Sequence, residues 1–156
     1  MKHHTISFTL NGTHEIRDVR SNLTLLRFLR EQLGVMGVKS GCDTGECGAC
    51  TVLLNGEPVN ACLVLAAEID GGKVITVEGL SMDDQLDPLQ QTFIDHNGIQ
   101  CGFCTPGVLI SAKALLTRNP HPDRDEIKDA LRGNLCRCTG YVRMIDAVEA
   151  AAKEGN

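Results

Sequence analysis

The sequence predicts an α+β fold in two halves, and a change of pattern near residue 80 is the main observation behind this prediction. Before that point polar and apolar residues alternate, as at residues 5–10, and the tight-turn pair Asn11-Gly12 follows. Beyond it, apolar residues recur at helical spacing, and residues that commonly cap helices precede each run. We therefore expect a mixed α+β domain over residues 1–80 and a helical domain over residues 81–156.

The first domain should contain an N-terminal β-hairpin, one helix and further strands. A helix is predicted over residues 23–33, because four leucines follow helical spacing and Gly34 can adopt the left-handed conformation that ends a helix. Residues 51–54 predict a buried strand, residues 55–56 a second tight turn, and residues 74–77 a further strand. This combination is typical of a small α+β domain.

Four helix starts are predicted in the second domain. Each begins with an Asp or a Thr whose side chain can accept a hydrogen bond from the first turn, and at two of them a proline follows. The four capping residues are Asp87, Thr105, Asp123 and Thr139. Glu126 follows Asp123 by three residues, which predicts a capping box. The second domain is therefore expected to be a four-helix domain.

Composition and charge exclude several kinds of function. The formal net charge is -5 and there is no Trp, so neither the basic surface nor the aromatic residues typical of nucleic-acid binding are present. No run of apolar residues is long enough to span a membrane, and no signal-peptide or twin-arginine pattern opens the sequence. We therefore expect a cytoplasmic protein with no membrane partner. In that reducing compartment, the 8 cysteines are expected to be metal ligands or redox groups rather than disulfides.

The first set of cysteines has a spacing typical of an iron-sulfur site. Its members are Cys42, Cys47, Cys50 and Cys62. The first three follow the C-x4-C-x2-C pattern of plant-type 2Fe-2S ferredoxins, in which a fourth cysteine lies further along the chain. Gly41, Gly45 and Gly48 would let backbone N–H groups approach the sulfur atoms closely. A structural zinc site is the alternative, although such sites more often pair two short C-x2-C hooks.

The second set combines a C-x2-C pair with a distant C-x-C pair. Its members are Cys101, Cys104, Cys136 and Cys138. On spacing alone, a zinc site is a stronger alternative to an iron-sulfur cluster for this set than for the first set. Because Cys104 precedes Thr105 and Cys138 precedes Thr139, each pair is expected to end at the start of a helix. The free N–H groups and positive dipole ends of both helices would then face the sulfurs, which suits an anionic cluster and equally a tetrathiolate zinc site.

Three longer segments contain most of these cysteines. They are GCDTGECGACTV at 41–52, QCGFCTPG at 100–107 and GNLCRCTGY at 133–141. Together they resemble the iron-sulfur subunit of the xanthine oxidase family of molybdenum hydroxylases, and the resemblance extends over nearly the whole chain. It implies a β-grasp, ferredoxin-like domain followed by a four-helix domain, each with one 2Fe-2S cluster. The implied ligands are Cys42, Cys47, Cys50 and Cys62 for the first cluster, and Cys101, Cys104, Cys136 and Cys138 for the second.

The resemblance also implies a function, an electron relay. In the family, single electrons pass between a molybdopterin centre and FAD through the two clusters, and Gln100 and Cys138 match residues that approach the pterin. Because the sequence ends at Asn156 without a flavin or molybdenum domain, we expect a large molybdopterin-binding subunit and a medium FAD-binding subunit as partners. The expected complex is a heterotrimer, which can also be doubled.

We expect no catalytic residue on this chain itself. No Ser-His-Asp arrangement, phosphate-binding loop or dinucleotide motif stands out in the sequence. The alternative function is that of a stand-alone iron-sulfur redox sensor or a zinc-stabilised interaction protein.

Overall fold

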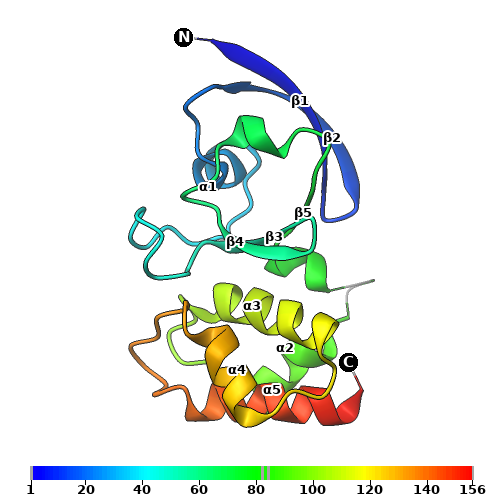
Figure 1. Ribbon diagram of the computed structural model, residues 1–156, viewed down its shortest axis with the longest axis vertical. Coiled ribbons are helices and arrows are strands. Elements are labelled where there is room, and N and C mark those ends of the chain that lie inside the picture. Colours follow the sequence, from blue (N-terminus) through cyan, green and yellow to red (C-terminus); the bar gives the residue numbers. More distant parts are fainter. Residues whose placement is uncertain (1, 82, 84, 156) are drawn as a thin grey trace.

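The computed structural model describes residues 2–81, 83 and 85–155, and its two halves are stacked along the long axis of the molecule (Figure 1). The first half contains the strands β1 (His3–Leu10), β2 (Thr13–Arg20), β3 (Thr51–Leu54), β4 (Glu57–Asn60) and β5 (Lys73–Ile75), with the short helices α1 (Leu25–Arg27), η1 (Phe28–Gln32), η2 (Ala66–Ile69) and η3 (Val77–Leu80). The second half contains the helices α2 (Pro88–Asp95), α3 (Thr105–Arg118), α4 (Arg124–Leu131) and α5 (Val142–Glu154). Met82 and Asp84, next to the predicted domain boundary, lie outside the described residues, as do Met1 and Asn156. The predicted α+β fold is confirmed.

The first half is built on a mixed β-sheet whose described strands run in the order β2-β1-β5-β3-β4. Strand β1 pairs antiparallel with β2 and parallel with β5, and β3 pairs antiparallel with both β4 and β5. The turns Asn11-Gly12 and Asn55-Gly56 join β1 to β2 and β3 to β4, and all four turn residues have positive φ. Asn and Gly adopt this conformation most easily, so the local sequence determines both turns. Both predicted turns are confirmed.

A short helical segment, α1 followed by the π-helical turn η1, packs against this sheet. Phe28 and Leu29 of η1 are fully buried, and the ring of Phe28 meets that of Phe8 on β1 edge to face, with the centroids 5.7 Å apart. The helix lies within the predicted range of 23–33, and Gly34 has the expected positive φ of 70. Thr24 caps its start, because the side-chain oxygen of Thr24 accepts a hydrogen bond from the N–H of Arg27.

Strand β5, the last strand in the sequence, ends earlier than predicted. It ends at Ile75, and η3 begins at Val77, within the range 74–77 that the sequence assigned to a strand. Thr76 is fully buried between them, and its N–H donates to the side-chain oxygen of Asn11 at 2.9 Å. A side chain from the first turn therefore takes the place of a neighbouring strand, and the sheet pairing stops there.

The second half packs its helices around one apolar core, and the described residues confirm the predicted four α-helices. Phe93, Val108, Ile127 and Val148, one from each helix, are fully buried there. The side chains of the predicted capping residues before α2 and α4 accept hydrogen bonds from backbone N–H groups, and the predicted capping box at the start of α4 is present. No helix in the described part of the chain is long and apolar enough to cross a membrane.

The predicted cap of α3 is wrong by one residue. The helix begins at Thr105 itself, and Cys104 is the residue before it. The hydroxyl of Thr105 does not cap the helix, because it is buried and has no hydrogen-bond partner among the described residues. The consequence for the site is small, since α3 still starts directly after a cysteine.

The predicted start of the last helix is also wrong. Helix α5 begins at Val142, because Gly140 and Tyr141 take the left-handed conformation, with φ values of 62 and 68. A right-handed helix cannot contain this conformation. The hydroxyl of Thr139 instead accepts a hydrogen bond from the N–H of Tyr141 at 3.1 Å. Cys138 therefore does not lie directly before a helix, contrary to the prediction from the sequence, because three residues separate it from the start of α5.

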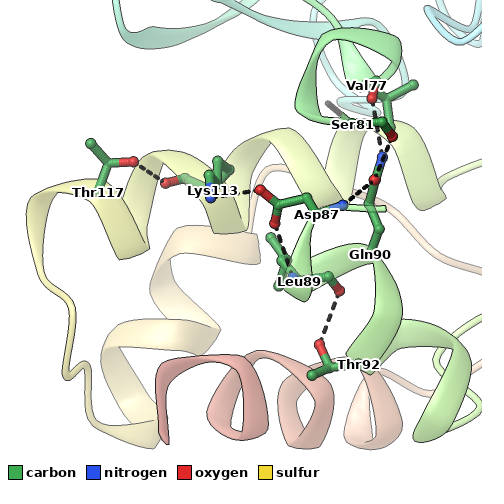
Figure 2. A network of polar contacts seen from close by, with 8 residues as sticks. All are labelled: Val77, Ser81, Asp87, Leu89, Gln90, Thr92, Lys113 and Thr117. Atoms are coloured by element: carbon green, nitrogen blue, oxygen red, sulfur yellow. Dashed lines mark hydrogen bonds and ion pairs between the residues drawn. The ribbon is translucent and has the colours of Figure 1, made fainter. Parts of the chain in front are cut away.

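Polar contacts attach the connection between the halves to the helical domain (Figure 2). The side-chain oxygen of Gln90 on α2 accepts hydrogen bonds from the hydroxyl of Ser81 at 2.8 Å and the N–H of Asp87 at 2.9 Å. The side-chain amide of Gln90 donates to the carbonyl of Val77 at 3.1 Å. Asp87 also forms an ion pair with Lys113 of α3 at 2.8 Å. Val77, Ser81 and Asp87, which lie on either side of residues 82 and 84, are thus held against α2 and α3.

The two halves contact each other through apolar packing as well. Helix α3 packs against β3 and β4 (Figure 1). Leu53 of β3 belongs to the core of the helical half, and Ile75 and Val77 pack against that same core. The position of the helical half relative to the sheet is therefore set by buried side chains and by the polar contacts above.

Candidate metal centres

The loop that follows Cys42 turns its backbone N–H groups toward the sulfur of this residue. Thr44 and Glu46 both donate to Cys42 Sγ, at 3.4 Å in each case. Asp43 and Gly45 make this turn possible with positive φ values of 56 and 81. Hydrogen bonds from the side chain and backbone of Thr44 lower the pKa of Cys42 to about 6. The loop therefore favours the thiolate, which is the form that binds a metal.

The β3–β4 hairpin brings the other members of the first set together. Cys50 directly precedes β3 and Cys62 follows β4, and the N–H of Ala61 donates to the carbonyl of Cys50 at 3.2 Å. Burial, together with the neighbouring thiols of Cys62 and Cys47, raises the pKa of Cys50 to about 12. Adjacent thiolates repel one another, so four of them can be held together only if a cation offsets the repulsion. This environment suits a metal-bound set of cysteines.

Gly41 allows a close approach between the backbone and a sulfur of the first set. A Cβ atom at this position would lie 2.8 Å from Cys47 Sγ, closer than real Cβ atoms come to a neighbour. The predicted role of this glycine, to admit backbone close to the sulfurs, agrees with this geometry.

The second set also comes together in space. Burial raises the pKa of Cys104 to about 12, and the neighbouring thiols of Cys136 and Cys101 contribute to the increase. The Cys101 thiol, followed by a smaller effect of Cys136, raises the pKa of Cys138. Two cysteines from the segment that precedes α3 and two from the 136–138 segment are therefore close enough to influence one another.

Hydrogen bonds favour the thiolate form of Cys136. Burial alone would raise the pKa of this thiol, but hydrogen bonds from Thr139, with those from Cys138 and Cys104, together outweigh burial and lower the pKa. Thr139 approaches Cys136 Sγ with its hydroxyl at 3.2 Å and its N–H at 3.5 Å. The second set thus has a polar turn that faces a sulfur, as the first set has at Cys42.

The two sets differ in their exposure to solvent. In the first set, Cys50 and Cys62 are buried and the other two are partly exposed. In the second set, Cys101 and Cys138 are exposed, and the neighbouring Gln100 is exposed too. The second set therefore reaches the surface of this chain on the side of Gln100 and Cys138.

The loops of the two sets are hydrogen-bonded to each other. The N–H of Leu135, next to Cys136, donates to the carbonyl of Cys47 at 2.9 Å. The side-chain amide of Asn134 donates to the carbonyl of Gly48 at 3.0 Å. The two candidate centres are thus neighbours, although their loops lie far apart in the sequence.

Asn134 and Tyr141 are site residues that the sequence reasoning missed. Asn134 is 3% exposed, and Tyr141 accepts a hydrogen bond from the N–H of Cys136 at 2.8 Å. Both lie within the motif segment 133–141, so the segment pointed to them, but a single sequence gave no reason to assign them a contact.

Both sites fit a 2Fe-2S cluster by the chemistry of their donors. Each consists of four free cysteines, the usual ligand set of such a cluster, with polar groups close to a sulfur. Within the described residues, no three His, Cys, Asp or Glu side chains are arranged to hold a single metal ion. A 2Fe-2S cluster divides its four thiolates between two iron atoms, so its ligands need not surround one point.

The fold and the two cysteine sets define a two-domain protein that binds a 2Fe-2S cluster in each half. Two family models, each of a 2Fe-2S domain, match the two halves of the chain. A 2Fe-2S iron-sulfur cluster binding domain matches residues 8–81, and a 2Fe-2S binding domain matches residues 76–149.

Known proteins resemble the chain over nearly its full length. The nicotinate dehydrogenase small FeS subunit of Eubacterium barkeri is 48% identical, over 96% of this chain and 95% of the relative. The structure of quinoline 2-oxidoreductase from Pseudomonas putida 86 matches with a TM-score of 0.94 and 44% identity, over 98% of this chain and 96% of that one. The aldehyde oxidoreductase of Megalodesulfovibrio gigas is 44% identical over 92% of this chain, which covers 16% of that longer protein.

The chain belongs to the iron-sulfur subunits of the xanthine oxidase family of molybdenum hydroxylases. It is thus an electron-transfer subunit of a multi-subunit oxidoreductase, and the predicted family and function are confirmed. A stand-alone redox sensor or a zinc-stabilised interaction protein is not supported by these similarities.

Proposed function

We propose that this chain relays single electrons between a molybdopterin centre on a large partner subunit and FAD on a medium partner subunit. The observation that carries the proposal is the direct hydrogen bond between the two ligand loops, from the N–H of Leu135 to the carbonyl of Cys47. A 2Fe-2S cluster takes up and releases one electron at a time. Two such sites in contact within one chain form a relay rather than two independent carriers.

The proposed ligands are the two four-cysteine sets. Cys42, Cys47, Cys50 and Cys62 would hold the first cluster, and Cys101, Cys104, Cys136 and Cys138 the second. The thiols of Cys47, Cys50 and Cys62 influence one another's pKa, as do those of the second set, which supports this division. The backbone of Cys47 donates a hydrogen bond that lowers the pKa of Cys42, which places Cys42 with the first set. We propose the domain boundary between residues 80 and 81, where the ranges of the two family models overlap.

The chain's own residues would adjust the redox properties of each site. The N–H groups of Thr44 and Glu46 donate to Cys42 Sγ, and Thr139 approaches Cys136 Sγ. Hydrogen bonds to a ligand sulfur reduce its negative charge, which makes reduction of the bound group easier. Thr44 and Thr139 are therefore proposed to raise the reduction potentials of the first and second site.

The second site is proposed to face the molybdopterin subunit, with Gln100 and Cys138 next to the pterin. Exposure of Gln100, Cys101 and Cys138 supports this orientation, because a partner must reach the site at the surface. The first site would then face FAD.

We propose a heterotrimeric complex, with a dimer of heterotrimers as its doubled form, located in the cytoplasm. The longer aldehyde oxidoreductase, of which this chain matches a small part, supports the presence of larger partners. No nucleic acid or membrane takes part in the proposed function.

Purification from native cells tests this assembly. A tagged copy of the chain at its natural level should bring down two larger proteins, with molybdenum and FAD in amounts equal to the chain. Recovery of the chain alone, with its clusters intact and without molybdenum or flavin, would reject the proposed complex. A tagged unrelated protein from the same cells is the control.

A further inference from the structure

We propose that Asn134 is a positioning residue that holds the two cysteine loops at a fixed separation, with Tyr141 as its support. The proposal rests on the proposed function, because it concerns the path between the two sites of the relay. It concerns a residue that ligates nothing itself and that lies between the two ligand sets.

The carbonyl of Gly48 is the point at which the loops meet. It accepts the side-chain amide of Asn134 at 3.0 Å, and within its own loop it accepts the hydroxyl of Thr51 at 2.7 Å and the N–H of Thr51 at 3.2 Å. The amide of Asn134 also donates to the Thr51 hydroxyl, at 3.3 Å. A buried polar group is costly without partners, so this arrangement specifies one position of the loop relative to Asn134.

The surroundings of Gly48 leave no room for a side-chain atom at this position. A Cβ atom at Gly48 would overlap the carbonyl oxygen of Gly133 and lie 2.7 Å from the amide nitrogen of Asn134. A Cβ atom at Gly107, in the first turn of α3, would overlap the carbonyl of Gly48. Three backbone segments, one of them the start of the helix that follows Cys104, therefore touch at this point.

Tyr141 fixes the other side of Asn134. The Tyr141 hydroxyl donates to the backbone carbonyl of Asn134 at 3.1 Å and accepts the N–H of Cys136 at 2.8 Å. In this position the backbone of Tyr141 is left-handed, with a φ of 68, which is uncommon for a residue other than glycine. Such strain persists only where the surroundings stabilise it.

These contacts create a short bonded route between two ligand cysteines. From Cys47 the route passes through one hydrogen bond to the N–H of Leu135, and Cys136 is the next residue. Asn134 lies directly before Leu135 and holds it against the 42–50 loop. Without the Asn134 amide, the hydrogen bond between Leu135 and Cys47 would open more often, and the two sites would vary in separation.

The test uses the complete complex and three variants. Asn134→Ala removes the amide, and Tyr141→Phe removes a single oxygen atom. Asn119→Ala is the matched control, because the side chain of Asn119 contacts Glu126 and His121, away from both cysteine loops. Iron and labile sulfide are measured first in each protein. The readouts are the magnetic splitting between the two reduced clusters and the hydrogen exchange of the Leu135 amide.

In Asn134→Ala with both clusters present, we expect a weaker or broadened splitting, since the interaction between two unpaired spins depends steeply on their separation. We expect exchange at Leu135 to rise about tenfold, equivalent to about 1.4 kcal/mol. Tyr141→Phe should change both readouts in the same direction, and Asn119→Ala should match the wild type.

Wild-type splitting and exchange in Asn134→Ala would overturn the proposal. If that variant does not fold, Tyr141→Phe decides in the same way. Absence of two cluster signals in the wild-type protein would instead overturn the proposed function itself.

Discussion

Single residues determine how close the two candidate centres can come. Gly48 is the clearest case, because it combines a positive φ of 68 with backbone contact to Gly133 and Asn134. Gly12 has a similar positive φ of 84 but has no atom within 4 Å of the position of a Cβ. Gly12 is needed only for its conformational freedom, whereas Gly48 is needed both for that freedom and because it has no side chain.

Gly48→Ala should therefore destabilise the protein more than Gly12→Ala. The turn variant should lose about 1–2 kcal/mol from backbone strain alone. The loop variant should lose about 1–3 kcal/mol more, because the methyl group displaces the segment at 133–134. Thermal unfolding of both holoproteins measures the difference, at about 2–4 °C for each kcal/mol. Equal losses would contradict the close contact at Gly48.

Cys42→Ser should remove the first cluster and leave the second largely intact. The proposed ligands of the two sites come from different loops, and the thiol of Cys42 receives its hydrogen bonds within its own loop. Paramagnetic resonance of the reduced protein, with iron analysis, counts the remaining clusters. Cys138→Ser, which targets the second set, should give the reverse pattern. Loss of both signals in a variant that remains folded would contradict independent ligand sets.

At the scale of elements, caps and polar networks fix where helices begin. Asp87 accepts the N–H of Leu89 at 2.9 Å and pairs with Lys113, and its side chain is only 10% exposed. The oxygen atoms of this one carboxylate thus join the start of α2 to the middle of α3 (Figure 2). The connection between the halves depends on the same residues, through Gln90.

Asp87→Ala should reduce stability by about 2 kcal/mol, because it removes both a cap and a partly buried partner of Lys113. Asp129→Ala is the matched control, since Asp129 is 69% exposed and pairs only at the surface with Arg132. That variant should lose about 0.5 kcal/mol or less. Chemical denaturation of the two variants side by side measures both effects. A loss at Asp87 no larger than the loss at Asp129 would show that the network in Figure 2 contributes little.

Local signals predicted the elements better than the contacts between them. The Asn-Gly turns and the capping box at Asp123 depend on residues adjacent in sequence, so the sequence alone was sufficient to place them. The start of α5 was missed because hydrogen bonds to Cys136 and Asn134 hold Tyr141 in a left-handed conformation. The contact between Asn134 and Gly48 joins residues 86 positions apart, and no local pattern specifies it.

At the scale of the whole molecule, the division of the cysteines into two ligand sets stays a prediction, and the structure supports it. Spacing divides them into two sets of four. The structure brings Cys47, Cys50 and Cys62 of the first set, and all four members of the second set, close enough for their thiols to alter one another's pKa. Cysteine spacing did not indicate that the sets would be neighbours, and only the family resemblance implied it. That proximity follows from the packing of α3 against β3 and β4, which brings the 42–50 loop to the segment at 133–136. A relay requires this arrangement, and two separate domains on a linker would not provide it.

Metal and sulfide analysis, combined with redox titration, tests the central claim most directly. With one 2Fe-2S cluster in each of the two matched domains, the purified complex should contain four iron atoms and four acid-labile sulfides per chain. Stepwise reduction should produce two distinct paramagnetic signals, each from one cluster. Zinc without labile sulfide, or a single cluster per chain in fully loaded protein, would contradict the account of this chain as a two-centre electron relay.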